Sequence, residues 1–282
     1  MSRTNRVGFL SFLCWCLVPG LSLAQDPQEP AIQVDWVQGP SSSPLGSVAQ
    51  VEVPEGYVFA GSEDTRELME MMENPLSGNE VGFLAPEERD WFIVFEFDGI
   101  GYVSDDEKEA LDADAILESL REGNDAANEI RRKNGWGTID IVGWHQPPHY
   151  NEQTHNLEWA TLARAESGET VINHNTRLLG RGGVMSATLV ADPERIAEVL
   201  PVSSSLLARY EFLPGSRYSE FKAGDKIAEY GLTALITGGA AAVALKSGLL
   251  QKFGKFIVFA VVALVASLRR FIAALFGRQA PE

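Results

Sequence analysis

The central part of the chain alternates between hydrophobic and polar residues with the two-residue period of β-strands. Three early runs of this kind predict strands at residues 48–53, 57–60 and 91–97. From residue 138 onward the alternation is almost continuous. It predicts four more strands, at residues 138–145, 155–165, 169–180 and 184–190.

Three other segments carry helix signals, namely a capping residue followed by helically spaced hydrophobic positions. They lie at residues 62–73, 112–133 and 192–200, with Ser62, Asp112 or Asp114, and Asp192 as the caps. The order of strands and helices predicts an α+β fold, with a mainly antiparallel sheet and flanking helices. This domain spans residues 48–222, and the Pro-, Ser- and Gly-rich residues 25–47 are expected to form a flexible segment before it.

The dipeptide Ser167-Gly168 predicts a two-residue hairpin turn between the strands at 155–165 and 169–180. In that register residue 166 pairs with residue 169, so Glu158 lies opposite Arg177 on a polar face. Leu157 and Trp159 then belong to the opposite, core face.

The N-terminal 24 residues have the three parts of a secretory signal peptide. Arg3 and Arg6 precede a short apolar core, and Ser22-Leu23-Ala24 provides the small residues of a cleavage site. The domain that follows is therefore expected to be exported. The alternative is an uncleaved anchor, for which the apolar core is short.

Two apolar runs near the C-terminus predict a transmembrane hairpin, with helices at residues 227–250 and 256–276 and a basic turn at 251–255. Lys246, Lys252 and Lys255 place the turn in the cytoplasm. The hairpin also brings Glu229 level with Arg270, and we expect either an ion pair between them or extension of the charged groups to the headgroups. The alternative is a pair of buried helices in a soluble domain.

Charge is distributed very unevenly along the chain. The net charge is −16, and residues 25–130 alone hold 26 acidic but four basic side chains. The negative electrostatic field of this excess of acids argues against nucleic acid as a partner and favours cationic proteins. A merely solvated acidic surface is the simpler explanation of the same pattern.

Both cysteines, Cys14 and Cys16, lie inside the predicted signal peptide. A cleaved protein therefore has no thiol for catalysis, disulfide formation or zinc binding. The chain has four histidines, but the two prolines between His145 and His149 prevent a helix that would present both on one side. We expect no metal and no other cofactor.

A spaced set of residues in the second half resembles a known family. It includes Trp144 to Tyr150, Asn173 with the segment 177–183, Gly215 with Tyr218 and Phe221, and Asp225 with the segment 228–232. The pattern is similar to that of a bacterial family of membrane-anchored proteins that carry a domain of unknown function. The resemblance covers about residues 35–270. It implies an exported, C-terminally anchored domain, and it implies no reaction.

Seven residues are the candidate contacts for a ligand or partner: Trp144, His149, Tyr150, Glu158, Asn173, Arg177 and Arg181. Arg177 and Arg181 lie on one face of a strand and could bind a carboxylate or phosphate through two hydrogen bonds each. The alternative is structural: a cross-strand ion pair between Glu158 and Arg177, with Arg181 holding a turn. No residue is assigned a catalytic role.

The sequence thus predicts a protein of the bacterial inner membrane, with its main domain in the periplasm and the bilayer and other envelope proteins as partners. Our first hypothesis is a non-enzymatic protein-interaction domain. One alternative is a tethered hydrolase or small-ligand-binding domain that uses the polar face of residues 155–181. Another is an accessory subunit of an inner-membrane complex. The sequence reveals no biochemical activity.

Overall fold

The computed structural model describes residues 33–237, apart from residues 89 and 153. The predicted signal peptide, the predicted turn at 251–255 and the second predicted membrane helix lie outside the described residues, as does most of the first. Arg270 also lies outside them, so its pairing with Glu229 stays a prediction. Glu229 itself is exposed.

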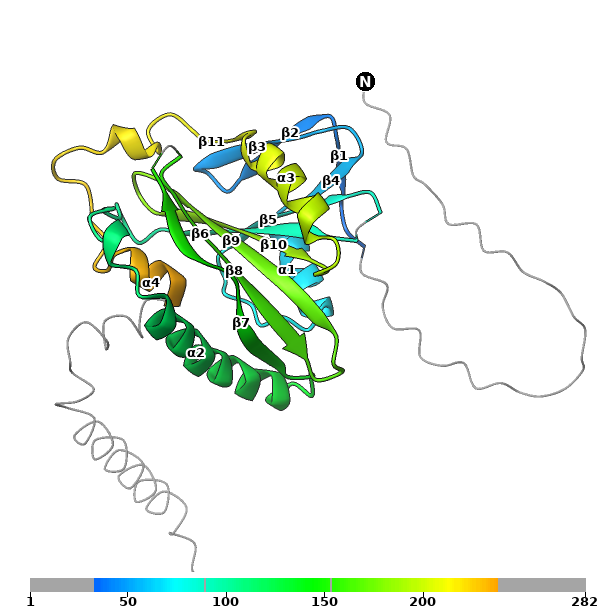
Figure 1. Ribbon diagram of the computed structural model, residues 1–282. Coiled ribbons are helices and arrows are strands. Elements are labelled where there is room, and N and C mark those ends of the chain that lie inside the picture. The colour runs from blue at the N-terminus through cyan, green and yellow to red at the C-terminus, as the bar shows by residue number, and fades with distance from the viewer. Residues whose placement is uncertain (1–32, 89, 153, 238–282) are drawn as a thin grey trace, which may run out of the picture. The chain divides into compact units, whose positions relative to one another are not determined.

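An eight-stranded antiparallel sheet forms the centre of the domain (Figure 1). Its strand order is β1-β4-β5-β6-β10-β9-β8-β7. The strands are β1 (Val37–Gln38), β4 (Tyr57–Ala60), β5 (Glu80–Pro86), β6 (Phe92–Asp98), β7 (Ile139–Asn151), β8 (Asn156–Ala165), β9 (Thr170–Leu179) and β10 (Val184–Ala191). A second sheet of three strands comprises β2 (Ser41–Leu45), β3 (Ala49–Val53) and β11 (Tyr210–Phe212).

Four α-helices accompany the sheets within the described residues: α1 (Ser62–Met71), α2 (Ala113–Lys133), α3 (Ile196–Leu207) and α4 (Leu232–Thr237). Two short 3-10 helices are η1 (Lys108–Ala110) and η2 (Tyr218–Glu220). The predicted cap of the long helix is confirmed, because the Asp112 side chain accepts a hydrogen bond from the Ala115 N–H. The α+β fold and its mainly antiparallel sheet are confirmed as well.

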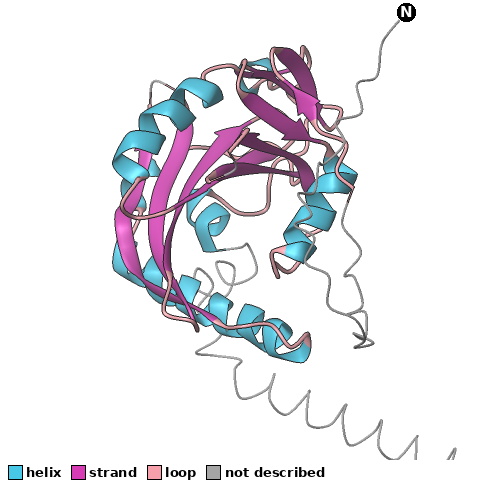
Figure 2. Ribbon diagram, turned by 90° about the vertical axis from the view of Figure 1, so that its right-hand side faces the viewer, coloured by secondary structure: helices cyan, strands magenta, loops and turns pink. Residues whose placement is uncertain are grey.

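Helices lie on both sides of the large sheet (Figure 2). One side, the α2 face, carries α1, α2 and α4, with an apolar cluster around Leu68 under α1 and another around Trp159 under α2 and α4. The other side, the α3 face, is covered by α3 and the small sheet, which bury Ile93 and Phe95 in the main core. Neighbouring strand residues alternate between these two faces.

Three expectations about individual elements are wrong. Residues 37–38 and 41–45, which we expected to be flexible, form β1 and β2. Strand β5 was missed because nearly all its residues are buried, so it does not alternate. Helix α3 begins at Ile196 rather than Asp192, because the Asp192 carboxylate accepts a hydrogen bond from the Glu194 N–H and closes a local turn first.

The register of the β8–β9 hairpin also differs from the prediction by one residue. Ala165 donates its N–H to the Glu169 carbonyl, so the loop has three residues, and Gly168 has a φ of +95°. Glu158 consequently lies opposite Thr176, and Arg177 lies opposite Leu157. The predicted opposition of Glu158 and Arg177 is wrong, because a shift of one residue moves a side chain to the other face.

Two glycines in open surroundings provide a test of this loop geometry. Gly168→Ala is expected to destabilise the domain by about 1 kcal/mol, because a Cβ is strained at positive φ. Gly123→Ala, in the exposed part of α2, is expected to stabilise it by about 1 kcal/mol. Urea unfolding of both variants checks the two signs. Stabilisation by Gly168→Ala would contradict the positive φ of the three-residue loop.

The described beginning of the first predicted membrane helix packs into the domain. Leu232, Ala234 and Ile236 of α4 are buried, and α4 lies against α2. Leu232 and Ile236 share the apolar cluster of Ile116 and Trp159. No helix of the described residues is long and apolar enough to cross a membrane. Residues 232–237 therefore contribute to the core of the domain, and the hairpin stays a prediction.

Candidate functional site

The seven candidate contact residues do not converge on one site. Trp144 and Tyr150 of β7 and Asn173 and Arg177 of β9 point to the α2 face, whereas His149 and Glu158 point to the α3 face. Arg181 follows β9 at the end of the sheet. The predicted cluster of Glu158, Asn173, Arg177 and Arg181 is therefore divided, because the predicted register is wrong.

A cavity of about 680 Å³ opens on the α3 face beside Glu158. Its walls come from the ends of β8 and β9, from α3, from β11 and from the turn at η2. The residues that matter most for its chemistry are Glu158, His174, Thr176, Ser203, Tyr210 and Tyr218. Of these, Glu158 alone was among the predicted contacts. Tyr210 and Ser203 carry no local motif, and folding brings them to Glu158 from far along the chain.

Glu158 is a mostly buried carboxyl group with a weak partner. Its Oε2 lies 3.7 Å from Nε2 of His149, and 22% of its side chain is exposed. Burial raises the pKa of Glu158, and the nearby His149 opposes this effect. Within the same wall, burial lowers the pKa of His174 to about 4, and His149 and His145 contribute, so His174 is neutral at pH 7.

The ring side chains of His155 and Tyr218 form one wall of the cavity. His155 has a φ of +55°, an uncommon conformation for a non-glycine residue. Its Nδ1 lies 3.1 Å from the Tyr150 hydroxyl, which donates to Asp105 at 2.8 Å. The His155 ring also lies 5.6 Å from the ring of Tyr218, which stacks on Tyr102. These contacts fix the orientation of the wall.

Arg177 lies in a second, smaller cavity on the α2 face, with Glu96, Asp98 and Tyr230 among its neighbours. Its guanidinium lies 4.6 Å from the centre of the Trp159 ring, and its Nε donates to the Leu235 carbonyl. Nη1 is buried without a hydrogen-bond partner in the described part of the chain. Burial lowers the pKa of Arg177 to about 10, although Glu96 and Asp98 oppose this, so it remains charged at pH 7.

Arg181 has a structural partner. Its Nε and Nη2 each donate to the Asp225 carboxylate at 2.7 Å. These bonds, together with the Lys222 N–H, lower the pKa of Asp225 to about 2. This ion pair ties the end of β9 to the segment that leads to α4. Arg181 therefore has a structural role.

No group of three or more potential metal ligands occurs among the described residues. His149 contacts Glu158, His155 contacts Tyr150, and His174 is buried next to the cavity. These three histidines therefore lie in different local environments.

Exposed carboxylates gather on the two helices of the α2 face. On α1 they are Glu63, Glu67 and Glu70; on α2 they are Asp114, Glu118, Glu122, Asp125 and Glu129. Because both helices pack on the same side of the sheet, the acidic half of the sequence becomes an acidic side of the domain. We call these eight residues the acidic face.

Fold and site together define an α+β domain with a mainly antiparallel sheet, a cavity on one face and an acidic face on the other. The chain belongs to the family described as protein of unknown function (DUF2167), whose model matches residues 37–269. The resemblance to a family that carries a domain of unknown function is therefore confirmed.

Two solved structures are similar to this chain at 10% sequence identity. The solution structure of cyanobacterial PsbP (CyanoP) from Synechocystis sp. PCC 6803 has a TM-score of 0.36, and the match covers 68% of this chain and 99% of that one. The crystal structure of the Saccharomyces cerevisiae Ran-binding protein Mog1p has a TM-score of 0.32, with 68% and 100% covered. No curated protein matches the chain.

Proposed function

We propose that the protein is a membrane-anchored protein of the bacterial cell envelope, whose exported domain binds a cationic envelope protein without catalysing a reaction. The acidic face is the observation that carries this proposal. It concentrates carboxylates from α1 and α2, two helices that are far apart in the sequence, on one side of the sheet.

The basic residues of these helices do not cancel the field fully. Arg66 lies 3.6 Å from the buried Glu80, and Arg121 donates to the carbonyls of Ile141 and Val142. In the last turn of α2, Arg131 is buried, whereas Arg132 and Lys133 are exposed and border the acidic face. A surface of one sign speeds association with an oppositely charged partner and makes binding sensitive to salt. A basic protein of the envelope therefore fits this surface better than an acidic one.

Charge reversal on α2 tests the proposal. The triple variant Glu118→Lys, Glu122→Lys, Glu129→Lys is expected to reduce in-cell crosslinking to the basic partner by roughly tenfold or more, because like charges then face each other. The measurement is crosslinking in cells followed by mass spectrometry of the captured proteins. A matched control is Glu52→Lys, Glu194→Lys, Glu198→Lys, which changes three acids away from the acidic face.

The control variant is expected to retain the crosslinks of the wild type. Equal loss in both triple variants, or capture of a mainly acidic partner, would contradict the proposed function. Co-extraction with one large membrane complex would favour the accessory-subunit alternative.

A further inference from the structure

We propose that the cavity on the α3 face binds a small organic cation, whose ammonium group pairs with Glu158. This site lies on the opposite side of the sheet from the acidic face. The inference therefore stands or fails independently of the proposed protein partner.

The charge inside the cavity favours a cation. Glu158 is the acidic residue of its interior wall, and its ionic contact with His149 is long, at 3.7 Å. The other acid at the cavity, Glu211, is more than half exposed at the rim, where it accepts a hydrogen bond from Gln50 and lies 3.8 Å from Arg217. Glu158 thus has room for a stronger partner.

Arg217 also lines the cavity, but this cation lies 3.8 Å from Glu211 and donates to the Phe212 carbonyl, so His149 is the positive group that competes at Glu158. His174 is buried and neutral at pH 7, and Thr176, directly opposite Glu158, is uncharged. Arg177 follows Thr176 in sequence, but its side chain lies on the α2 face. A bound anion would instead meet the Glu158 carboxylate, at a substantial electrostatic cost.

The remaining walls suit a cation with an apolar or aromatic body. The Tyr218 ring is held by Tyr102 and His155, and aromatic faces attract cations. Leu178 and Leu207 supply apolar surface. Tyr210 also lines the cavity, and its hydroxyl is buried without a hydrogen-bond partner among the described residues.

The size of the cavity indicates a small molecule. A volume of about 680 Å³ falls within the range of about 300–1,000 Å³ typical of small-molecule sites. Benzylamine is a suitable probe, because benzyl alcohol and benzoate have the same ring with a neutral or a negative group.

Saturation-transfer NMR titrations on the full-length protein in detergent test the inference. At pH 7.5 we expect benzylamine to bind at least tenfold more tightly than benzyl alcohol, and benzoate to bind more weakly than either. Glu158→Gln keeps the shape of the side chain and removes its charge, so the preference for the amine is expected to disappear. Glu169→Gln, at the exposed β8–β9 loop, is the matched control and is expected to keep it.

A second variant, at His149, tests the pairing of the ammonium group with Glu158 by removing the partner of this carboxylate. His149→Ala removes the competing contact at a half-exposed position and is expected to tighten benzylamine binding about threefold. An amine preference that persists in Glu158→Gln, or equal binding of benzylamine and benzyl alcohol by the wild type, would overturn the inference. Weaker amine binding by His149→Ala would count against it as well.

Discussion

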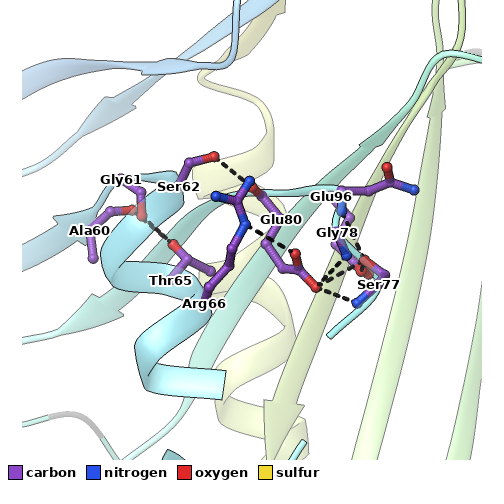
Figure 3. A network of polar contacts seen from close by, with 10 residues as sticks. Ala60, Gly61, Ser62, Thr65, Arg66, Ser77, Gly78, Glu80 and Glu96 are labelled. Atoms are coloured by element: carbon purple, nitrogen blue, oxygen red, sulfur yellow. Dashed lines mark hydrogen bonds and ion pairs between the residues drawn. The ribbon is translucent and has the colours of Figure 1, made fainter. Parts of the chain in front are cut away.

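Replacement of Glu80 by alanine is expected to lower the free energy of unfolding by about 3 kcal/mol. Glu80 begins β5 and is buried, and its Oε1 accepts hydrogen bonds from the Ser77 N–H, the Ser77 hydroxyl and the Gly78 N–H (Figure 3). Its Oε2 faces Arg66. Removal leaves several donors unpaired, and hydrogen bonds to charged groups contribute about 1.5–3 kcal/mol each.

Guanidinium unfolding of the full-length protein, followed by tryptophan fluorescence, measures this effect. Glu96→Ala is the matched control, because Glu96 pairs with Glu80 across the strands but is less buried, and it shares the single Ser77 hydroxyl proton with Glu80. We expect the control to lose less than about 1 kcal/mol. Equal losses of unfolding free energy in the two variants would show that the hydrogen bonds of Glu80 contribute no more to stability than those of Glu96.

The Glu80 effect is also expected to depend on pH. Burial alone raises the pKa of Glu80, but hydrogen bonds from backbone N–H groups and the Ser77 hydroxyl outweigh it, so the pKa lies below its ordinary value. The wild type therefore keeps this stabilisation above about pH 4.5, where the unfolded-state carboxyl is ionised, and loses it as the pH falls through the lower folded-state pKa. The difference between wild type and Glu80→Ala should narrow below that pH, and a constant difference would argue against an ionised Glu80.

Leu232→Ala is expected to destabilise the domain by about 3 kcal/mol. Leu232 is fully buried in the cluster under α2 and α4, and removal of a buried leucine side chain leaves a cavity that costs about 2–5 kcal/mol. The same unfolding measurement checks it. Ile227→Ala is the control in the same predicted membrane segment, because Ile227 is 61% exposed and its loss is expected to change stability by less than about 0.5 kcal/mol.

The two residues separate two descriptions of this segment. If residues 227–237 belonged to a membrane helix and not to the domain, Leu232→Ala would leave the unfolding of the α+β domain unchanged. A large loss for Leu232 together with little change for Ile227 is the pattern that the packing of α4 predicts.

Local sequence signals predicted much of the fold. The predicted cap at Asp112 or Asp114 placed the start of α2, and alternation placed β6 and the strands from β8 to β10. Strand β7 was predicted to end at residue 145, but it continues to Asn151. Alternation could not find β5, which is buried on both sides, and the Ser167-Gly168 signal did not distinguish a two-residue turn from a three-residue loop. The register of a hairpin changes by one residue when its loop has three residues instead of two. The predicted two-residue turn therefore assigned Arg177 to the wrong face of the sheet.

The candidate site was less predictable than the fold. Glu158 could be selected as a polar residue in a strand, but its cavity is completed by Ser203 and Tyr210, which reach it through the packing of α3 and β11. No spacing in the sequence encodes that contact. The sequence showed that the first half of the chain is acidic. The gathering of these carboxylates on one side of the domain depends on the packing of α1 and α2 on the same face of the sheet.

Cysteine labelling tests the exported, membrane-anchored arrangement most directly. With Cys14 and Cys16 replaced by serine, single cysteines are introduced as Glu122→Cys on α2 and Lys252→Cys in the predicted cytoplasmic turn. A membrane-impermeant maleimide is expected to label position 122 in intact spheroplasts and position 252 only after lysis. Protection of position 122 until lysis, or labelling of position 252 in intact spheroplasts, would contradict the account.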